Sequence, residues 1–256
     1  MEIRVGRICL AALSGLGLSS LALAEDGYDA PDHWPSPMQE HLRGSVLVDR
    51  LEYVWPSEDS EAVSWDFQAW YGGDVHRVYL KGEGDNTQGD GEDAEFESLD
   101  LLYSRLIADF WELQGGLGYQ GGLGSDDHPE RYFGVISLQG LAPYRLETEL
   151  DLRVSDDGDT SLSLEQEYDL RLTQRLYLQP RLEMEVAFDD AEEFGVGEGF
   201  NSLRTGLRLR YELHRKFAPY IGAYWQKLYG DTADMARDEG DQVEDTAVVA
   251  GLRVWF

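Results

Sequence analysis

Two groups of side chains in this sequence have the chemistry to attract or bind metal cations. The first group consists of carboxylates spaced two residues apart along three segments: Glu147, Glu149, Asp151, Glu165, Glu167, Glu183 and Glu185. The second group combines two imidazoles with a thioether in one short segment: His33, Met38 and His41. Carboxylates attract cations of many kinds, whereas imidazole suits Cu(II) and thioether suits Cu(I), so the second group fits copper.

The carboxylates require β-strands to hold them on one surface. Alternate side chains of a strand point to opposite faces, and Leu146, Thr148, Leu150 and Leu152 alternate with the carboxylates around Glu149. The same alternation recurs along most of the chain in segments of about ten residues, the length of a tilted transmembrane strand. After the N-terminal segment, no run approaches the roughly 18 apolar residues of a spanning helix. This pattern favours a transmembrane barrel over a soluble sandwich.

Twelve of these segments are predicted as strands: 46–55, 62–71, 76–85, 94–105, 110–120, 131–140, 144–155, 160–172, 175–188, 202–213, 217–229 and 246–256. The connectors between them alternate in length. Short turns fall near 72–75, 142–143, 173–174 and 215–216, and longer acidic loops fall at 86–93, 121–130, 189–201 and 230–245. Short periplasmic turns and long outer loops are typical of outer-membrane barrels. The predicted fold is an all-β, transmembrane, antiparallel up-and-down β-barrel of about 12 strands.

Aromatic and apolar residues near the strand ends support the same fold. Aromatic residues suited to the two girdles at the membrane interfaces are Tyr53, Trp55, Trp65, Trp70, Tyr71, Trp111, Tyr119, Tyr144, Trp225 and Tyr229. The last strand has one apolar face, made of Val248, Ala250, Leu252, Val254 and Phe256. A final strand that ends on an aromatic residue resembles the signal by which outer-membrane proteins reach their assembly machinery.

The N-terminus is predicted to be a cleaved export signal. A short basic region containing Arg4 and Arg7 precedes an apolar stretch that closes on the small-x-small pattern Ala22-Leu23-Ala24. Residues 1–24 are therefore predicted as signal peptide, 25–45 as an N-terminal periplasmic extension and 46–256 as the barrel. The single cysteine, Cys9, falls in the signal, so the exported chain is expected to lack disulfides and thiolate metal sites.

The charge of the chain restricts its partners. The net charge is −29, and removal of the signal, with its two Arg and one Glu, makes it −30. Nucleic acid is excluded as a partner because phosphate binding needs a basic surface. Cationic partners are favoured instead.

The alternation places both signs of charge inside the barrel. Besides the seven carboxylates above, the predicted interior acids are Glu52, Asp66, Glu83, Asp100, Glu112, Asp169 and Glu212. The predicted interior cations are Arg50, Arg77, Lys81, Arg153, Arg171, Arg181, Arg204, Arg208, Arg210 and Arg253. Two interpretations remain open: a lumen plugged by salt bridges, or a negatively charged funnel in which surplus carboxylates concentrate cations. Both can hold at different heights of one barrel.

Nine segments of the sequence resemble the copper resistance protein B family. They are HWPSPM (33–38), DRLEYVW (49–55), WYGGDVHRVYLKGEG (70–84), LYSR (102–105), LQGLAPYRLETE (138–149), EYDLRLTQRLYLQPR (167–181), LRLRYELHRKFAPYIG (207–222), YGDTAD (229–234) and VAGLRVWF (249–256). The similarity runs in order through essentially the whole exported chain. One departure is that the Met- and His-rich region preceding the barrel in many members is reduced here to the stretch around His33, Met38 and His41.

The resemblance implies an outer-membrane copper-resistance protein of a Gram-negative bacterium, with copper as bound or transported ion. It also implies periplasmic multicopper oxidase and copper carrier proteins as partners, beside the lipid of the outer membrane. Three rivals remain: a closed barrel that docks periplasmic copper proteins, a general cation porin, and a membrane-embedded hydrolase. Outer-membrane phospholipases present a Ser beside a His, but none of the five His here has a Ser two positions on. The sequence therefore predicts that the chain is not an enzyme.

Overall fold

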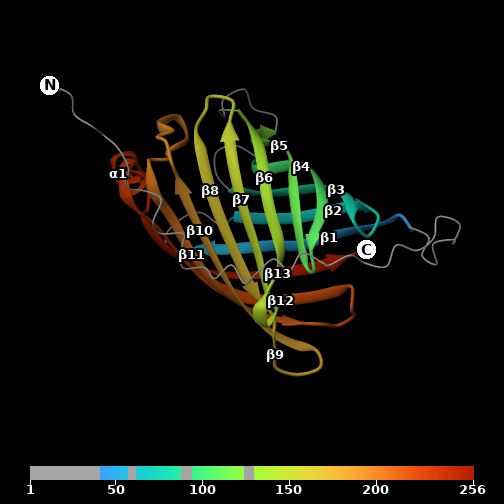
Figure 1. Cartoon of the computed structure of the whole chain (residues 1–256). Coiled ribbons are helices and arrows are strands. Elements are labelled where there is room, and N and C mark those ends of the chain that lie inside the picture. The colour runs from blue at the N-terminus through green and yellow to red at the C-terminus, as the bar shows by residue number, and fades with distance from the viewer. Residues whose placement is uncertain (1–40, 57–61, 88–93, 124–129) are drawn as a thin grey trace, which may run out of the picture. The chain divides into compact units, whose positions relative to one another are not determined.

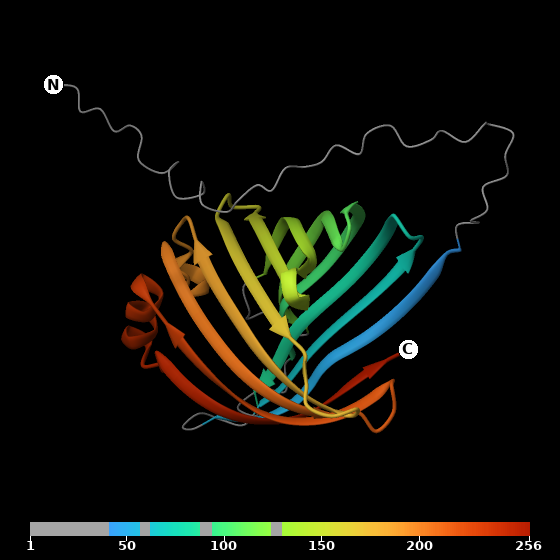
Figure 2. The ribbon, with the colours of Figure 1, turned by 60° about the horizontal axis from the view of Figure 1, so that its bottom comes forward.

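Thirteen strands form one antiparallel sheet that curves round and closes on itself (Figure 1, Figure 2). The computed structural model describes residues 41–56, 62–87, 94–123 and 130–256. The strands are β1 Arg43–Pro56, β2 Ala62–Gly72, β3 His76–Thr87, β4 Ala94–Ala108, β5 Trp111–Leu123, β6 Arg131–Ala142, β7 Leu146–Ser155, β8 Thr160–Tyr168, β9 Leu170–Arg171, β10 Leu176–Ala187, β11 Gly199–Tyr211, β12 Phe217–Leu228 and β13 Glu244–Trp255. Three short helices accompany them: η1 Pro143–Arg145, η2 Glu192–Phe194 and α1 Gly230–Glu239. None of the helices in these ranges is long and apolar enough to cross a membrane.

The sheet closes because its first strand pairs with its last. β1 and β13 are antiparallel, and Val46 and Phe256 exchange two backbone hydrogen bonds of 3.2 and 2.8 Å at the seam. β8 and the two-residue β9 both pair with β10, so they are two parts of one interrupted barrel strand. Counted in this way the barrel has twelve strands, and the predicted antiparallel barrel is confirmed.

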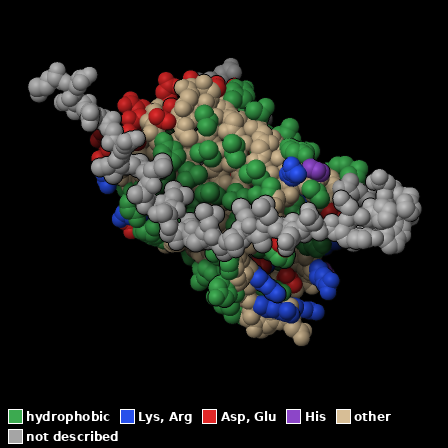
Figure 3. Space-filling view, viewed as in Figure 1, with side chains coloured by type: hydrophobic (Ala, Val, Ile, Leu, Met, Phe, Trp, Pro, Cys, Tyr) green, Lys and Arg blue, Asp and Glu red, His purple; other side chains and the backbone are tan. Residues whose placement is uncertain are grey.

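The alternating pattern places apolar side chains on the outside of the wall. Leu117, Ile136 and Ile221 are among the most exposed hydrophobic residues, with exposed fractions of 72%, 56% and 62%. Hydrophobic side chains accordingly cover much of the surface in Figure 3. Lipid supplies the apolar surroundings that these side chains need.

Several predicted boundaries differ from the observed ones. The predicted strand 144–155 begins at Leu146, because the η1 turn holds Tyr144 and Arg145 at φ values of 70° and 65°. The predicted connector 230–245 contains α1, which ends at Gly240 in the left-handed conformation that favours glycine. Trp70, assigned to an aromatic girdle, instead packs against an interior cluster of Tyr79, Leu102, Phe133 and Val135.

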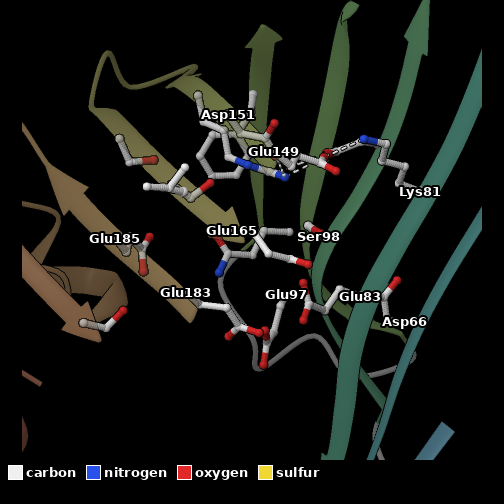
Figure 4. A pocket seen from close by; sticks show the side chains of 18 of the residues that line it. Asp66, Lys81, Glu83, Glu97, Ser98, Glu149, Asp151, Glu165, Glu183 and Glu185 are labelled. Carbon is white, nitrogen blue, oxygen red and sulfur yellow. Dashed lines mark hydrogen bonds and ion pairs between the residues drawn. The ribbon is translucent and has the colours of Figure 1, made fainter. Parts of the chain in front are cut away.

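A β-bulge in β1 changes which side chains face the interior. The pairing of β1 with β2 shifts by one residue between Val48 and Arg50, so strict alternation breaks there. As a result the consecutive residues Asp49 and Arg50 both make ion pairs inside the barrel, with Arg253 and Asp66 respectively. A second shift, between Phe96 and Leu99 of β4, lies beside Glu97, which points into the interior cavity (Figure 4).

Candidate functional site in the barrel interior

The interior of the barrel holds a cavity of about 630 Å³ with a strongly acidic wall. All seven carboxylates of the predicted ladder line this cavity: Glu147, Glu149, Asp151, Glu165, Glu167, Glu183 and Glu185. Figure 4 shows the labelled members of the set pointing toward one another from neighbouring strands. In total, fourteen acidic and five basic side chains line the cavity, so its wall is rich in negative charge.

Strand register brings the ladder carboxylates directly opposite one another. Across β7 and β8, Glu147 pairs with Glu167 and Glu149 pairs with Glu165. Across β8 and β10, Glu165 pairs with Glu183. Like charges in directly opposed positions destabilise a sheet, so this wall needs cations from elsewhere in the barrel.

Two buried arginines supply most of the compensating charge. Arg181 of β10 makes ion pairs with Glu165 at 2.6 Å and Glu167 at 2.9 Å, and also contacts Glu183. Arg50 of β1 binds Asp66 at 3.0 Å and lies 3.5 Å from Glu183. It also contacts Glu83 of β3. We call Arg50, Arg181 and the carboxylates that they contact the central ion-pair cluster.

The central ion-pair cluster crosses the lumen. β1 and β10 are separated by β11, β12 and β13 in the sheet, so the Arg50–Glu183 contact joins distant parts of the wall. Lys81 of β3 likewise reaches Glu149 of β7 at 2.5 Å. Arg153 of β7 binds Asp100 of β4 at 2.6 Å. These contacts occupy part of the barrel interior.

Other interior cations are also paired. Arg208 binds Glu52 at 2.6 Å, Arg210 binds Asp169 at 2.6 Å, Arg253 binds Asp49 at 2.8 Å and Arg77 binds Glu112 at 2.7 Å. Buried charges of this kind are stable only when they are paired and hydrogen-bonded. These pairs fit the interpretation of the interior as a salt-bridge network.

Three acids on the cavity wall have no such partner. Glu97, Glu147 and Glu185 line the cavity, and none of them makes an ion pair or side-chain hydrogen bond with another residue in the described ranges. We call these three the free carboxylates. Their charge is not offset by a contacting cation, so it remains available to an ion in the lumen.

The outer mouth of the cavity is narrowed by the connector between β10 and β11. Phe194 of η2 lines the cavity and packs on the guanidinium of Arg131, 4.5 Å from its ring centre. On the other side Arg131 lies over Phe133 at 5.1 Å, and it is also ion-paired with Asp159. The Gly197 N–H donates a 2.9 Å hydrogen bond to the hydroxyl of Thr232 in α1, which holds the connector in place.

The other predicted site residues have different positions. His33 and Met38 lie outside the described residues, and His41 is exposed immediately before β1. Arg171 and Glu212, both predicted to face the lumen, instead lie at the end of the barrel that carries the short turns. There, Arg171 is exposed and hydrogen-bonds Thr173 O at 3.2 Å, and Glu212 follows the last residue of β11.

Sequence analysis missed four acids of the cavity wall. Asp49 and Glu97 lie next to β-bulges that strict alternation does not detect, and Asp159 and Asp189 lie in connectors outside the strands. Within the residues that the structure describes, His, Cys, Asp and Glu side chains form no group of three or more that could hold a metal ion. The wall therefore offers dispersed negative charge and no preformed coordination sphere in this part of the chain.

Comparison with known proteins identifies the family. The family described as "Copper resistance protein B precursor (CopB)" matches residues 42–256. The chain belongs to the copper resistance protein B family. The resemblance found in the sequence is thereby confirmed, and the match covers every strand of the barrel.

Two curated members of the copper resistance protein B family are similar over most of the chain. Copper resistance protein B of Escherichia coli is 40% identical over 213 residues, which are 82% of this chain and 69% of that protein. The copper resistance protein B homolog of Pseudomonas syringae pv. tomato (strain ATCC BAA-871 / DC3000) is 36% identical over 215 residues, or 84% of this chain and 70% of that protein.

Solved structures show the same fold at low sequence identity. The NanC porin is 14% identical, with a TM-score of 0.50 and coverage of 82% of this chain and 98% of the porin. Outer membrane phospholipase A from Escherichia coli is 11% identical, with a TM-score of 0.51 and coverage of 81% and 92%. These likenesses establish an outer-membrane barrel fold for this member of the family and carry no information on its activity.

Proposed function

We propose that this outer-membrane barrel binds copper ions in its acid-rich lumen and conducts them across the membrane as part of copper resistance. The observation that carries the proposal is the excess of carboxylates on the cavity wall, including the free carboxylates Glu97, Glu147 and Glu185. A narrow space of one charge sign, with low-dielectric walls, concentrates counter-ions. The names of the two curated relatives supply the choice of copper as the ion.

Dispersed carboxylates suit conduction better than storage. An ion passes through a pore only when binding is strong enough to draw it in and weak enough to let it leave. The ladder from Glu147 to Glu185 presents several weak positions along the wall, and hard carboxylate ligands bind copper less selectively than imidazole or thioether. Selectivity for copper is then expected to come from the N-terminal segment, which the purified barrel retains.

The N-terminal segment completes the proposal. Cleavage after Ala24 would leave residues 25–45 as a periplasmic extension containing His33, Met38 and His41. These side chains would give copper to, or take it from, a periplasmic multicopper oxidase or copper carrier. Both oxidation states of copper find a suitable ligand among them. No enzymatic step is part of this function.

A closed docking barrel is the second candidate. The ion pairs that cross the lumen favour it, since Arg50–Glu183 and Lys81–Glu149 occupy the path that an ion would take. In that case the barrel would act only as an anchor for periplasmic copper proteins. A general cation porin without preference for copper would share the acidic lumen and differ only in its range of ions.

Ion flux into liposomes that contain the purified barrel distinguishes these functions. Copper entry that exceeds calcium and zinc entry supports the proposal, and equal entry of all three supports the general porin. Flux of no ion supports the docking barrel. The matched variant replaces all seven ladder carboxylates with Gln, which keeps their size and removes their charge. Unchanged cation-to-anion selectivity in that variant would contradict a role for the ladder.

A further inference from the structure

The cations on the outside of this acidic protein gather at one end of the barrel. Seven basic residues lie at the end that carries the short turns: Arg43, Arg105, Arg145, Arg171, Arg175, Arg215 and Lys216. All seven are exposed, and none forms an ion pair with any residue of the described ranges. Near the opposite end, partly exposed Lys227 and exposed Arg237 are both ion-paired. In Figure 3 basic side chains gather near the β9 end, and acidic side chains near the α1 end.

One of these cations, Arg105, lies on the outward wall and not at the tip of a turn. It belongs to β4, in which Leu101 and Tyr103 face outward with exposed fractions of 57% and 54%, whereas Leu102 and Ser104 are buried inside. Alternation therefore directs Arg105 outward, toward lipid. Its cross-strand partner is His76, the first residue of β3, so Arg105 lies level with the end of the membrane-spanning wall.

Arg105, His76 and Tyr103 form a polar group on this wall. The Tyr103 hydroxyl and His76 Nδ1 are 2.6 Å apart, and the two rings stack at 5.9 Å with an interplanar angle of 18°. Directly paired residues of neighbouring strands have Cβ atoms about 5 Å apart, which places the Arg105 side chain beside the imidazole. Exposed Val78 and Ile107 flank the group with apolar surface.

An arginine in this position needs an anionic partner. A charge on the lipid face is costly at the bilayer midplane and tolerated near the interface, where phosphate groups are within reach. The nearby acids Asp74 and Asp109 are exposed in turns and make no ion pair with Arg105. Guanidinium binds phosphate through paired hydrogen bonds. The hydrogen-bonded Tyr103–His76 pair leaves one further donor, the Tyr103 O–H when His76 Nδ1–H donates to the hydroxyl, or His76 Nε2–H when the hydroxyl donates to Nδ1.

We propose that Arg105, His76 and Tyr103 bind the headgroup of an anionic phospholipid in the periplasmic leaflet of the outer membrane. The other six cations of the rim would favour the same leaflet through their summed charge. A lipid fits better than an acidic protein because the outward wall at Arg105 faces the bilayer. An acidic protein would instead contact the cations at the turn tips, such as Arg175 and Lys216.

Native mass spectrometry of the full-length barrel tests this site. The protein is released from mixed micelles that contain equal amounts of phosphatidylglycerol and phosphatidylcholine, and the retained lipids are counted. Wild type is expected to retain phosphatidylglycerol preferentially. Arg105→Gln is expected to lower this retention about fivefold, the effect of losing one cation beside anionic lipid. Arg105→Lys is expected to restore part of it, because the positive charge returns.

Control experiments distinguish lipid binding at Arg105, His76 and Tyr103 from binding at the cations of the turn tips and from binding of free phosphate. Lys227→Gln removes one partly exposed, ion-paired cation at the opposite end and is expected to leave lipid retention unchanged. Heat-modifiable migration on gels shows that each variant is folded. Equal retention of the two lipids by wild type would overturn the proposal. So would loss of retention only when Arg175, Arg215 and Lys216 are replaced, since binding would then belong to the turn tips. Displacement of the lipid by inorganic phosphate alone would show that the group binds free phosphate and not a headgroup.

Discussion

The central ion-pair cluster and the free carboxylates share one cavity but differ in how their charge is used. In the cluster, Arg181 contacts three carboxylates, and Arg50 contacts two further carboxylates and shares Glu183 with Arg181. The free carboxylate Glu185 lies on β10, which also carries Arg181, and Glu147 lies on β7, next to β8; neither has a contacting cation in the described structure. Residues of one type, on neighbouring strands, therefore have opposite roles.

The carboxylates of the cluster are needed for the stability of the fold, whereas the free carboxylates have charge that a cation in the lumen could bind. A buried carboxylate that contacts guanidinium has exchanged its water for protein partners, and its charge is offset locally. A carboxylate that faces a polar cavity without a partner keeps water or a mobile cation as its counter-charge. The cluster is expected to control stability and closure of the lumen, and the free carboxylates are expected to control which ions enter.

The largest expected effect is on stability, through Arg181. Arg181→Met removes the cation shared by Glu165, Glu167 and Glu183 and leaves three carboxylates close together inside the barrel. Breaking a buried ion pair from one side costs about 3–5 kcal/mol, so the free energy of unfolding in urea should fall by about that amount. The same substitution at exposed Arg175, which has no ion pair within the described ranges, should leave unfolding unchanged. An equal loss of unfolding free energy at both positions would show that the central ion-pair cluster stabilises the barrel no more than an exposed arginine does.

The second effect is on conductance, through Arg50. Arg50→Gln breaks the contacts that join β1 to β10 across the lumen and removes a positive charge from the ion path. Cation conductance in planar bilayers should rise by on the order of tenfold, the lower end of the range for field focusing. Arg77→Gln is the control, because its pair with Glu112 joins β3 to β5 near the wall. Equal conductance of wild type and Arg50→Gln would show that the lumen is closed elsewhere.

The third effect is on selectivity, through the free carboxylates. Glu147→Gln combined with Glu185→Gln should reduce the preference for cations over anions by about threefold, an effect that weakens as salt screens the charges. Unfolding should change by less than about 0.5 kcal/mol, because no ion pair of the described structure is lost. Reversal potentials at two salt concentrations, with urea titrations, test both parts. A large loss of stability would mean that these two acids belong to the cluster.

The positions of the ladder residues could be predicted because their strands are regular. β7, β8 and β10 pair without a bulge over the ladder, so a period of two was sufficient to place Glu147, Glu165 and Glu183 on the inner face. The bulges in β1 and β4 reversed the faces locally, and Asp49 and Glu97 were missed for this reason. The helix α1 was missed because its ten residues were assigned to a long acidic loop.

The partners of each charge could not be predicted from the sequence. Contacts such as Arg50–Glu183 join residues that are 133 positions apart, and they depend on which strands face each other across the closed barrel. Strand order gives neighbours, but the stagger of the strands decides which inward side chains lie at one height. The division between paired and free carboxylates is therefore a property of the three-dimensional structure.

The smallest expected effect concerns Phe194, at the outer mouth of the cavity. Phe194 packs on Arg131, which is ion-paired with Asp159 and also lies over Phe133, so this buried cation is held by a carboxylate and two rings. Phe194→Ala should lower the free energy of unfolding by about 1 kcal/mol, of which the cation–π contact contributes about half. Phe194→Leu keeps most of the apolar contact and loses the ring, so it should recover the other half. If Leu restored wild-type stability, packing alone would hold the connector, and the cation–π contact with Arg131 would contribute nothing measurable.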